Sequence, residues 1–189
     1  MGGSKVSFFP FFLFVLLQRL LELFIAKRNE RVMRQRGAFE FGQGHYKYMV
    51  MLHVSFLLAV LLEVTLFGRS ESPLWPVLLA GFVAVQLLRA WAILSLGAFW
   101  NTKIIVLPGA EVVAKGPYKY IRHPNYMVVI VEFLLIPLLF QAYFTAVLFS
   151  ILNVLLLRVR IRAEEKALME ATAYEKTFAN RSRFTPKRY

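Results

Sequence analysis

Cysteine and aspartate are both absent from this chain of 189 residues. The lack of cysteine excludes disulfides, thiolate nucleophiles, zinc–thiolate sites and iron–sulfur clusters, and also the radical chemistry that such clusters support. Because all 11 acidic residues are glutamate, the usual magnesium and phosphoryl-transfer sites lose their commonest ligand. The three histidines, His45, His53 and His123, have no spacing typical of a metal site, so we expect no bound metal.

Charged residues are also scarce, at 18% of the chain, whereas hydrophobic residues make up 58% and the mean hydropathy is +0.56. A soluble domain is about 45–50% apolar and about 25% charged. A domain of this size cannot bury such an excess, so the composition predicts an integral membrane protein. The net charge of +12 favours contact with anionic membrane lipids over nucleic acid, because basic residues flank apolar runs.

The apolar runs predict an all-α fold with five membrane helices. A span needs about 20 apolar residues, and residues 6–26, 46–67 and 74–96 each meet that length. Residues 127–157 are too long for one span and too short for two ordinary ones. Pro137 and Gln141 lie near their middle, so we expect a tight helical hairpin there.

Basic residues predict how these helices are oriented. They crowd the loop that we expect after the first span (27–36), the loop after the third (103–122) and the tail from residue 158, whereas the opposite side has only Lys5 and Arg69. The positive-inside rule then places the N-terminus outside and the C-terminus in the cytoplasm. We expect one membrane domain over 1–189, with three spans in 1–96. Its second part, 97–189, would hold a loop, the hairpin and a C-terminal helix, and the loop and that helix would form a cytoplasmic cap.

The first candidate functional stretch is the loop before the hairpin, residues 116–126. Pro124 disfavours helix at His123 and suits the first turn of the following helix, which places His123 at a helix cap. Free backbone N–H groups at such a terminus can bind a carboxylate or phosphate. The structural alternative is a membrane-interface turn in which Tyr118, Tyr120 and Tyr126 form an aromatic belt.

The second candidate stretch is residues 158–165, where the last span reaches the cytoplasm. On a continuous helix Arg160 and Glu164 lie four residues apart and share a face. The structural alternative is a set of arginines whose charges reach the membrane boundary, followed by a solvated helix. Because the hairpin joins the two stretches, we expect them to face each other.

Together these motifs resemble the isoprenylcysteine carboxyl methyltransferase family. The resemblance covers residue 101 to the C-terminus and rests on Gly-Pro-Tyr118, Arg-His-Pro-Asn-Tyr126, the apolar hairpin and Arg-Ile-Arg-Ala-Glu-Glu165 followed by Leu168. Residues 18–29 and 42–46 are similar to the short bacterial branch, in which a relative methylates alkylpyrones made by a type III polyketide synthase. The resemblance implies a multi-pass enzyme of the bacterial plasma membrane that uses S-adenosylmethionine to O-methylate a lipophilic acceptor. It also implies a functional link to a polyketide synthase.

The resemblance also implies roles for individual residues. Arg160 matches the arginine that holds the anionic oxygen of the acceptor, a prenylcysteine carboxylate or an alkylpyrone enol. The other matches are to donor contacts, and they include a strand-like segment at residues 110–113: Ile105, Ala110, Glu111, Val112, Val113, Tyr118, His123, Pro124, Asn125, Tyr126 and Glu164. Because such an acceptor is already anionic near neutral pH, no strong general base is required.

Two other readings compete with the methyltransferase. Sterol reductases share a related C-terminal half, so an NADPH-dependent membrane reductase is the first, and a non-catalytic membrane protein that binds lipid or a partner enzyme is the second. A soluble dinucleotide-type fold is not supported, because no Gly-x-Gly-x-x-Gly follows a strand. The intramembrane charges Glu63, Arg89 and Glu132 are functional candidates by position, although we rank a structural pairing of Arg89 with Glu132 or Glu22 ahead of catalysis.

Overall fold

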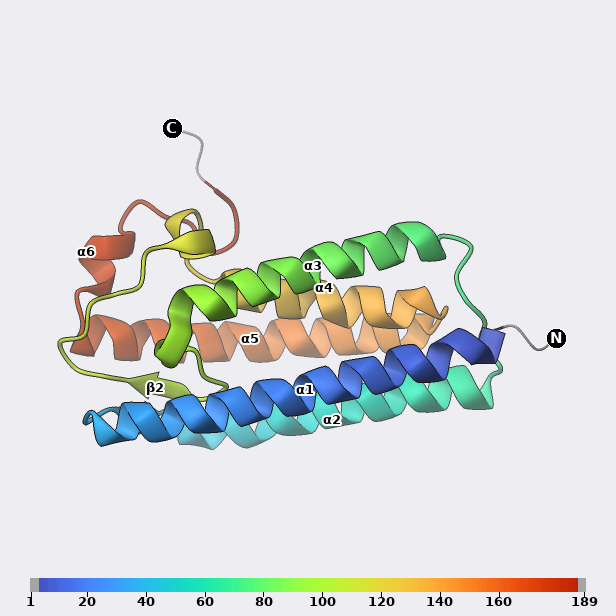
Figure 1. The fold of residues 1–189 in the computed structure, drawn as a ribbon, viewed down its shortest axis with the longest axis horizontal. Coiled ribbons are helices and arrows are strands. Elements are labelled where there is room, and N and C mark those ends of the chain that lie inside the picture. The colour runs from blue at the N-terminus through green and yellow to red at the C-terminus, as the bar shows by residue number, and fades with distance from the viewer. Residues whose placement is uncertain (1–3, 187–189) are drawn as a thin grey trace.

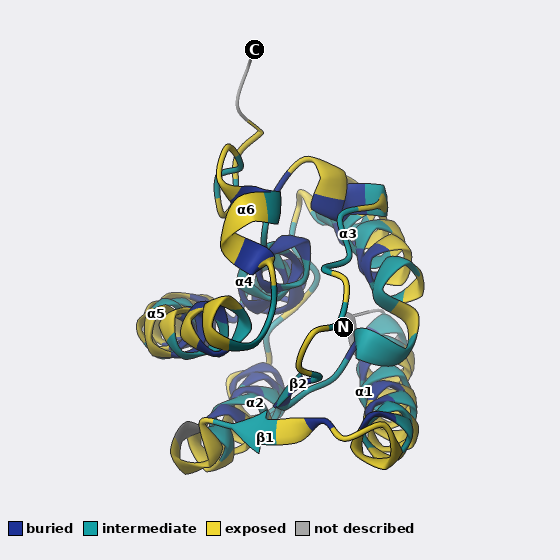
Figure 2. Ribbon diagram, turned by 90° about the vertical axis from the view of Figure 1, so that its left-hand side faces the viewer, coloured by how far each residue is buried: buried dark blue, intermediate teal, exposed yellow. Residues whose placement is uncertain are grey.

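Five long helices lie side by side and form an elongated bundle in the computed structural model (Figure 1). The structure describes residues 4–186, with the side chains of all of them except residues 4–6 and 45. They are α1 (Ser4–Gln35), α2 (Gln43–Leu66), α3 (Trp75–Leu96), α4 (Pro124–Leu139) and α5 (Tyr143–Ala171). Viewed along the bundle, exposed residues cover the outer faces of the helices (Figure 2).

The exposed faces are apolar, as in a protein surrounded by lipid. Leu66, Leu94 and Phe24 are among the many large apolar side chains on the surface, and a helix that is hydrophobic on all sides is typical of a membrane span. Within residues 4–186, four segments are long and apolar enough to cross a membrane: Ser7–Gln35, Tyr46–Leu66, Trp75–Phe99 and Tyr143–Ala171. The chain is therefore a multi-pass, all-α integral membrane protein.

The predicted hairpin is confirmed as α4 and α5. Helix α4 ends at Leu139, just after Pro137, and α5 begins at Tyr143, with Gln141 in the turn at a φ of 54°. Helix α4 has 16 residues, about 24 Å at 1.5 Å each, so it is shorter than a usual span of about 30 Å. Helix α5 has 29 residues against the 16 of α4, so its last turns extend beyond the start of α4.

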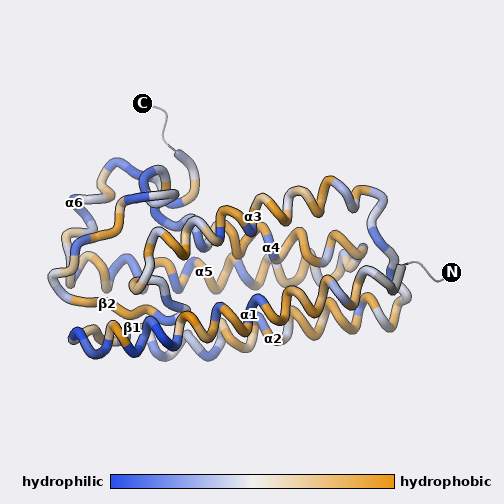
Figure 3. Tube along the Cα trace, viewed as in Figure 1, coloured by the Kyte–Doolittle hydropathy of each residue, from blue (hydrophilic) through white to orange (hydrophobic). Residues whose placement is uncertain are grey.

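A polar cap covers one end of the bundle. It contains the short strands β1 (Phe39–Phe41) and β2 (Ile104–Val106), the 3-10 helices η1 (Gly97–Phe99) and η2 (Gly116–Lys119), the end of α5 and helix α6 (Tyr174–Phe178). Hydrophilic residues concentrate at this end, which lies opposite the start of α1 (Figure 3). The antiparallel pairing of Phe39 with Val106 brings the connection after α1 against the loop after α3.

Two expectations about local structure are wrong. Residues 110–113 are not strand-like: the pairing strand is Ile104–Val106, and the turn at Pro108 and Gly109 leaves residues 110–114 without a partner strand. The basic segment 27–36 is also not a loop, because α1 continues to Gln35. Lysine, arginine and glutamate are good helix formers, and nothing interrupts them before Gly37, which has a φ of 90°.

Candidate functional site

A cavity of about 540 Å³ extends from the cap into the bundle. This volume lies within the range of about 300–1,000 Å³ that is usual for small-molecule sites. Among its lining residues are eleven of the twelve residues assigned from the sequence: Ile105, Ala110, Glu111, Val112, Val113, Tyr118, His123, Asn125, Tyr126, Arg160 and Glu164. Pro124 does not line the cavity; it is buried as the first residue of α4, behind the N-cap residue His123.

The two predicted stretches meet inside this cavity, as expected. The Tyr126 hydroxyl donates a hydrogen bond to the Glu164 carboxylate and accepts one from Arg160 Nε at 2.9 Å. Arg160 Nη2 donates to the Thr102 carbonyl oxygen at 2.6 Å, which fixes the guanidinium from a second side. The remaining nitrogen, Nη1, has no hydrogen bond within the described part of the chain, so Arg160 keeps a donor for a ligand.

His123 is held by Glu165, a residue that the sequence reading did not single out. The distance from His123 Nε2 to Glu165 Oε1 is 3.0 Å, and Arg183 donates to both oxygens of the same carboxylate, at 3.0 and 2.5 Å. The backbone N–H of His123 donates to the Arg183 carbonyl oxygen at 3.1 Å, and that of Arg122 to the Ser182 carbonyl oxygen at 3.0 Å. The C-terminal segment at residues 182–183 therefore bonds both to the loop that contains His123 and to α5, and holds the two together.

Several buried polar atoms around the cavity have no hydrogen-bond partner among the described residues. Asn125 Oδ1, Trp100 Nε1 and the Tyr174 hydroxyl all belong to this set, and all three residues line the cavity. Buried polar groups in proteins nearly always have a partner, so these atoms are available for hydrogen bonds to a polar ligand or to water. Burial, together with the Glu164 carboxylate, raises the pKa of Tyr118 well above its usual value and keeps that phenol protonated.

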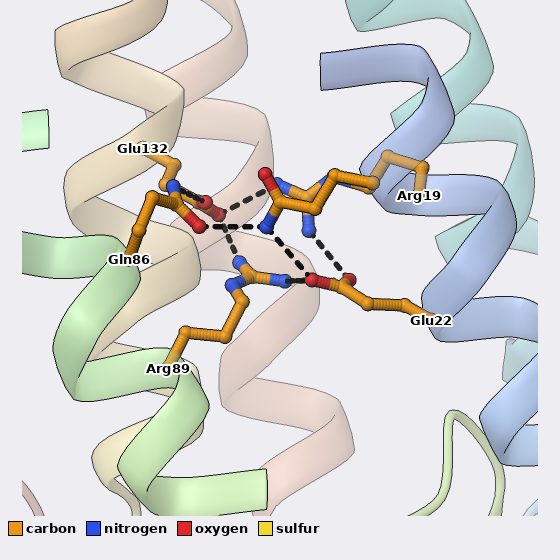
Figure 4. Close-up of polar contacts among 6 residues, drawn as sticks. Arg19, Glu22, Gln86, Arg89 and Glu132 are labelled. Atoms are coloured by element: carbon orange, nitrogen blue, oxygen red, sulfur yellow. Dashed lines mark hydrogen bonds and ion pairs between the residues drawn. The ribbon is translucent and has the colours of Figure 1, made fainter. Parts of the chain in front are cut away.

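The membrane half of the cavity is lined by an ion network, in which Arg89 is bonded to both Glu22 and Glu132 (Figure 4). The structural pairing of Arg89 that we preferred from the sequence is therefore confirmed. Arg19, Gln18 and Gln86 also belong to the network and were not assigned to it from the sequence. Arg19 donates to Glu22 at 2.8 Å and to Glu132 at 2.7 Å. A charged or amide side chain inside an apolar span is visible in the sequence, but which of these residues pair depends on how α1 packs against α3.

The other intramembrane charge, Glu63, lies outside the cavity lining and has a structural role. Its Oε2 accepts hydrogen bonds from the backbone N–H of Thr145 at 2.8 Å and from the Thr145 hydroxyl at 2.7 Å. These groups lie in the first turn of α5, where backbone N–H groups have no partner within the helix. Glu63 thus caps α5 from α2.

The cavity also reaches the lipid-facing surface. Leu20 and Leu23 of α1 and Val50 and Val54 of α2 line it, and all four are exposed side chains within apolar spans. The cavity therefore opens between α1 and α2, at the height of the apolar spans. An apolar chain can enter there directly from the bilayer.

Comparison with known proteins identifies one matching family and two similar bacterial proteins. Residues 77–170 match the model of the isoprenylcysteine carboxyl methyltransferase (ICMT) family. The chain is 53% identical to "Uncharacterized protein YpbQ" of Bacillus subtilis over 156 residues, which is 82% of this chain and 93% of that protein. It is 30% identical to an "Uncharacterized protein" of Haemophilus influenzae over 155 residues, 82% of this chain and 90% of that protein.

Proposed function

Because the chain belongs to the isoprenylcysteine carboxyl methyltransferase family and is therefore a membrane methyltransferase, we propose that it uses S-adenosylmethionine to methylate an anionic oxygen of a lipophilic acceptor. The observation that carries this proposal is the meeting of Tyr126, Arg160 and Glu164 in one cavity that spans the cap and the bundle. A prenylcysteine carboxylate and an alkylpyrone enol both meet the chemical requirement. We also propose that the cap faces the cytoplasm, where the donor is made.

The cap half of the cavity fits such a donor. Glu164 supplies a negative charge beside a neutral Tyr118, which suits a cationic ligand. Asn125 Oδ1 and the hydroxyl of Tyr174 are buried polar atoms in need of partners, and a ligand with an amine, ribose hydroxyls and a base can provide them. S-Adenosylmethionine supplies a methyl group on a sulfonium, so its leaving group is already in place.

The residues between the two halves position the acceptor. Arg160 is fixed by Tyr126 and Thr102, and its Nη1 is left to bind the anionic oxygen of the acceptor. Because that oxygen is already negatively charged, alignment and the exclusion of water are sufficient and no proton has to be removed. The opening between α1 and α2 gives the apolar tail of the acceptor a route from the bilayer.

The test is transfer of labelled methyl from S-adenosylmethionine by the protein in nanodiscs, with a farnesylated cysteine derivative and a long-chain alkylpyrone in competition. We expect Glu164→Gln to weaken donor binding, and Arg160→Lys to lose transfer while donor binding is kept, because lysine cannot replace the fixed guanidinium. Glu170→Gln and Arg162→Lys, exposed positions on the same helix, are the matched controls.

Two results would reject the proposal. One is that both site variants behave like their controls in donor binding and in transfer. The other is saturable binding of NADPH with no binding of S-adenosylmethionine, which would favour a membrane reductase.

A further inference from the structure

The ion network has more hydrogen-bond donors than its own acceptors use. The guanidinium groups of Arg19 and Arg89 carry ten N–H groups in total. The structure gives them five hydrogen bonds, all to Glu22 and Glu132. Arg89 is only 4% exposed, so water cannot easily reach its guanidinium, yet its buried Nε has no partner among the described residues.

In the carboxylates, by contrast, every oxygen already accepts at least one hydrogen bond. Both oxygens of Glu22 accept from Arg89, and Gln18 and Arg19 add one further bond each. Glu132 Oε1 accepts from Gln86 at 2.7 Å, and its Oε2 accepts from both arginines. Gln18 Oε1 is a buried acceptor without a partner among the described residues, but Gln18 does not line the cavity, so what the network offers to a ligand there is N–H donors.

The two residues that carry these donors, Arg19 and Arg89, both line the cavity. His53 lines the same half and adds an acceptor. Its Nδ1 lies 2.8 Å from the Met49 carbonyl oxygen, which can only accept, so Nδ1 carries the proton and the neutral ring has its lone pair on Nε2. A hydroxyl can accept from an arginine and donate to His53 at the same time.

The charges of the network determine whether a neutral or an anionic oxygen of a ligand can bind to these arginines. Two arginines balance two glutamates, so there is no net positive charge to hold a second anion in the membrane. The unused donors therefore suit a neutral oxygen. Along α4, Glu132 lies six residues beyond Tyr126, which places the network about 9 Å deeper in the bundle.

We propose that Arg19, Arg89 and His53 form a second polar subsite, which binds a neutral hydroxyl of the lipid acceptor several carbons away from its reacting anionic oxygen. This proposal rests on the proposed function, because it takes the anionic oxygen to lie at Arg160. It predicts that an acceptor with a neutral hydroxyl at this distance binds more tightly than an otherwise identical acceptor without one.

The test compares three lipid carboxylates for binding to the protein in nanodiscs: hexadecanoic acid, 7-hydroxyhexadecanoic acid and 16-hydroxyhexadecanoic acid. One hydrogen-bonded group contributes about threefold to tenfold in Kd. We expect the 7-hydroxy acid to bind tighter by that factor than the other two. The 16-hydroxy isomer controls for polarity, since its hydroxyl lies at the far end of the chain. Equal binding of all three acids, or binding of none, would overturn the proposal.

Variants on α2 locate the effect. His53→Phe keeps a ring against Phe133, which His53 contacts edge-on with centroids 5.0 Å apart, and removes Nε2. We expect it to lose the preference for the 7-hydroxy acid, whereas Met51→Phe, on the exposed side of the same helix, keeps it. Equal preference in both variants would overturn the assignment to this subsite.

Binding of labelled S-adenosylmethionine, measured in the same nanodiscs, separates the two proposals. Donor binding without a hydroxyl preference would overturn the subsite alone. A hydroxyl preference without donor binding would overturn the donor assignment and leave the subsite standing.

Discussion

Replacing Glu132 by glutamine tests how strongly the ion network holds α1 against α3 and α4. Glu132 is 1% exposed and its carboxylate is bonded to Arg19 and Arg89. Glutamine keeps the shape but leaves two guanidinium groups against one carboxylate. A hydrogen bond to a charged group contributes about 1.5–3 kcal/mol, and breaking a buried ion pair costs about 3–5 kcal/mol. We therefore expect Glu132→Gln to lower the free energy of unfolding by about 3–5 kcal/mol.

The assay is equilibrium unfolding of the purified protein in mixed micelles, followed by circular dichroism. Glu170→Gln is the control, because Glu170 pairs with Lys166 only at the exposed surface, where such a pair contributes at most about 1 kcal/mol. Adding Arg19→Gln to Glu132→Gln restores the charge balance, so the double variant should lose less stability than the sum of the two single variants. A Glu132→Gln protein as stable as the control would refute the reasoning.

Two further substitutions probe how the cap and the hairpin are held. Gly116 has a φ of 58°, and a Cβ there would lie 2.0 Å from Ser95 Oγ, whereas a Cβ at Gly109, with a φ of 69°, meets nothing within 4 Å. Both alanine variants carry left-handed backbone strain of about 1–2 kcal/mol. We expect Gly116→Ala to lower the thermal unfolding temperature more than Gly109→Ala does. Equal decreases would contradict the expected clash with Ser95. Glu63→Gln should destabilise by about 0.5–2 kcal/mol, because it weakens the cap on Thr145, yet leave methyl transfer intact; a loss of transfer in the folded variant would contradict a purely structural role.

The membrane helices and the hairpin could be predicted from the sequence because their causes are local. An apolar run of about 20 residues has few stable structures in lipid other than a helix, since every backbone polar group must find a partner within the segment. Pro124 starts α4 with His123 as its N-cap, and Pro137 and Gln141 end that helix and form the turn before α5, as expected. That the two stretches of the candidate site face each other could also be predicted, because the hairpin joins them, whereas the roles of their residues came from the family resemblance.

What only the tertiary structure decided depends on contacts between distant segments. Adjacent residues on a helix point about 100° apart, so the sequence could not tell that Glu164 meets Tyr126 while Glu165 meets His123 and Arg183. The strand at Ile104–Val106 forms because the segment after α1 lies beside it. The ion network likewise joins three helices, and its composition follows from helix packing, which no single stretch of sequence specifies.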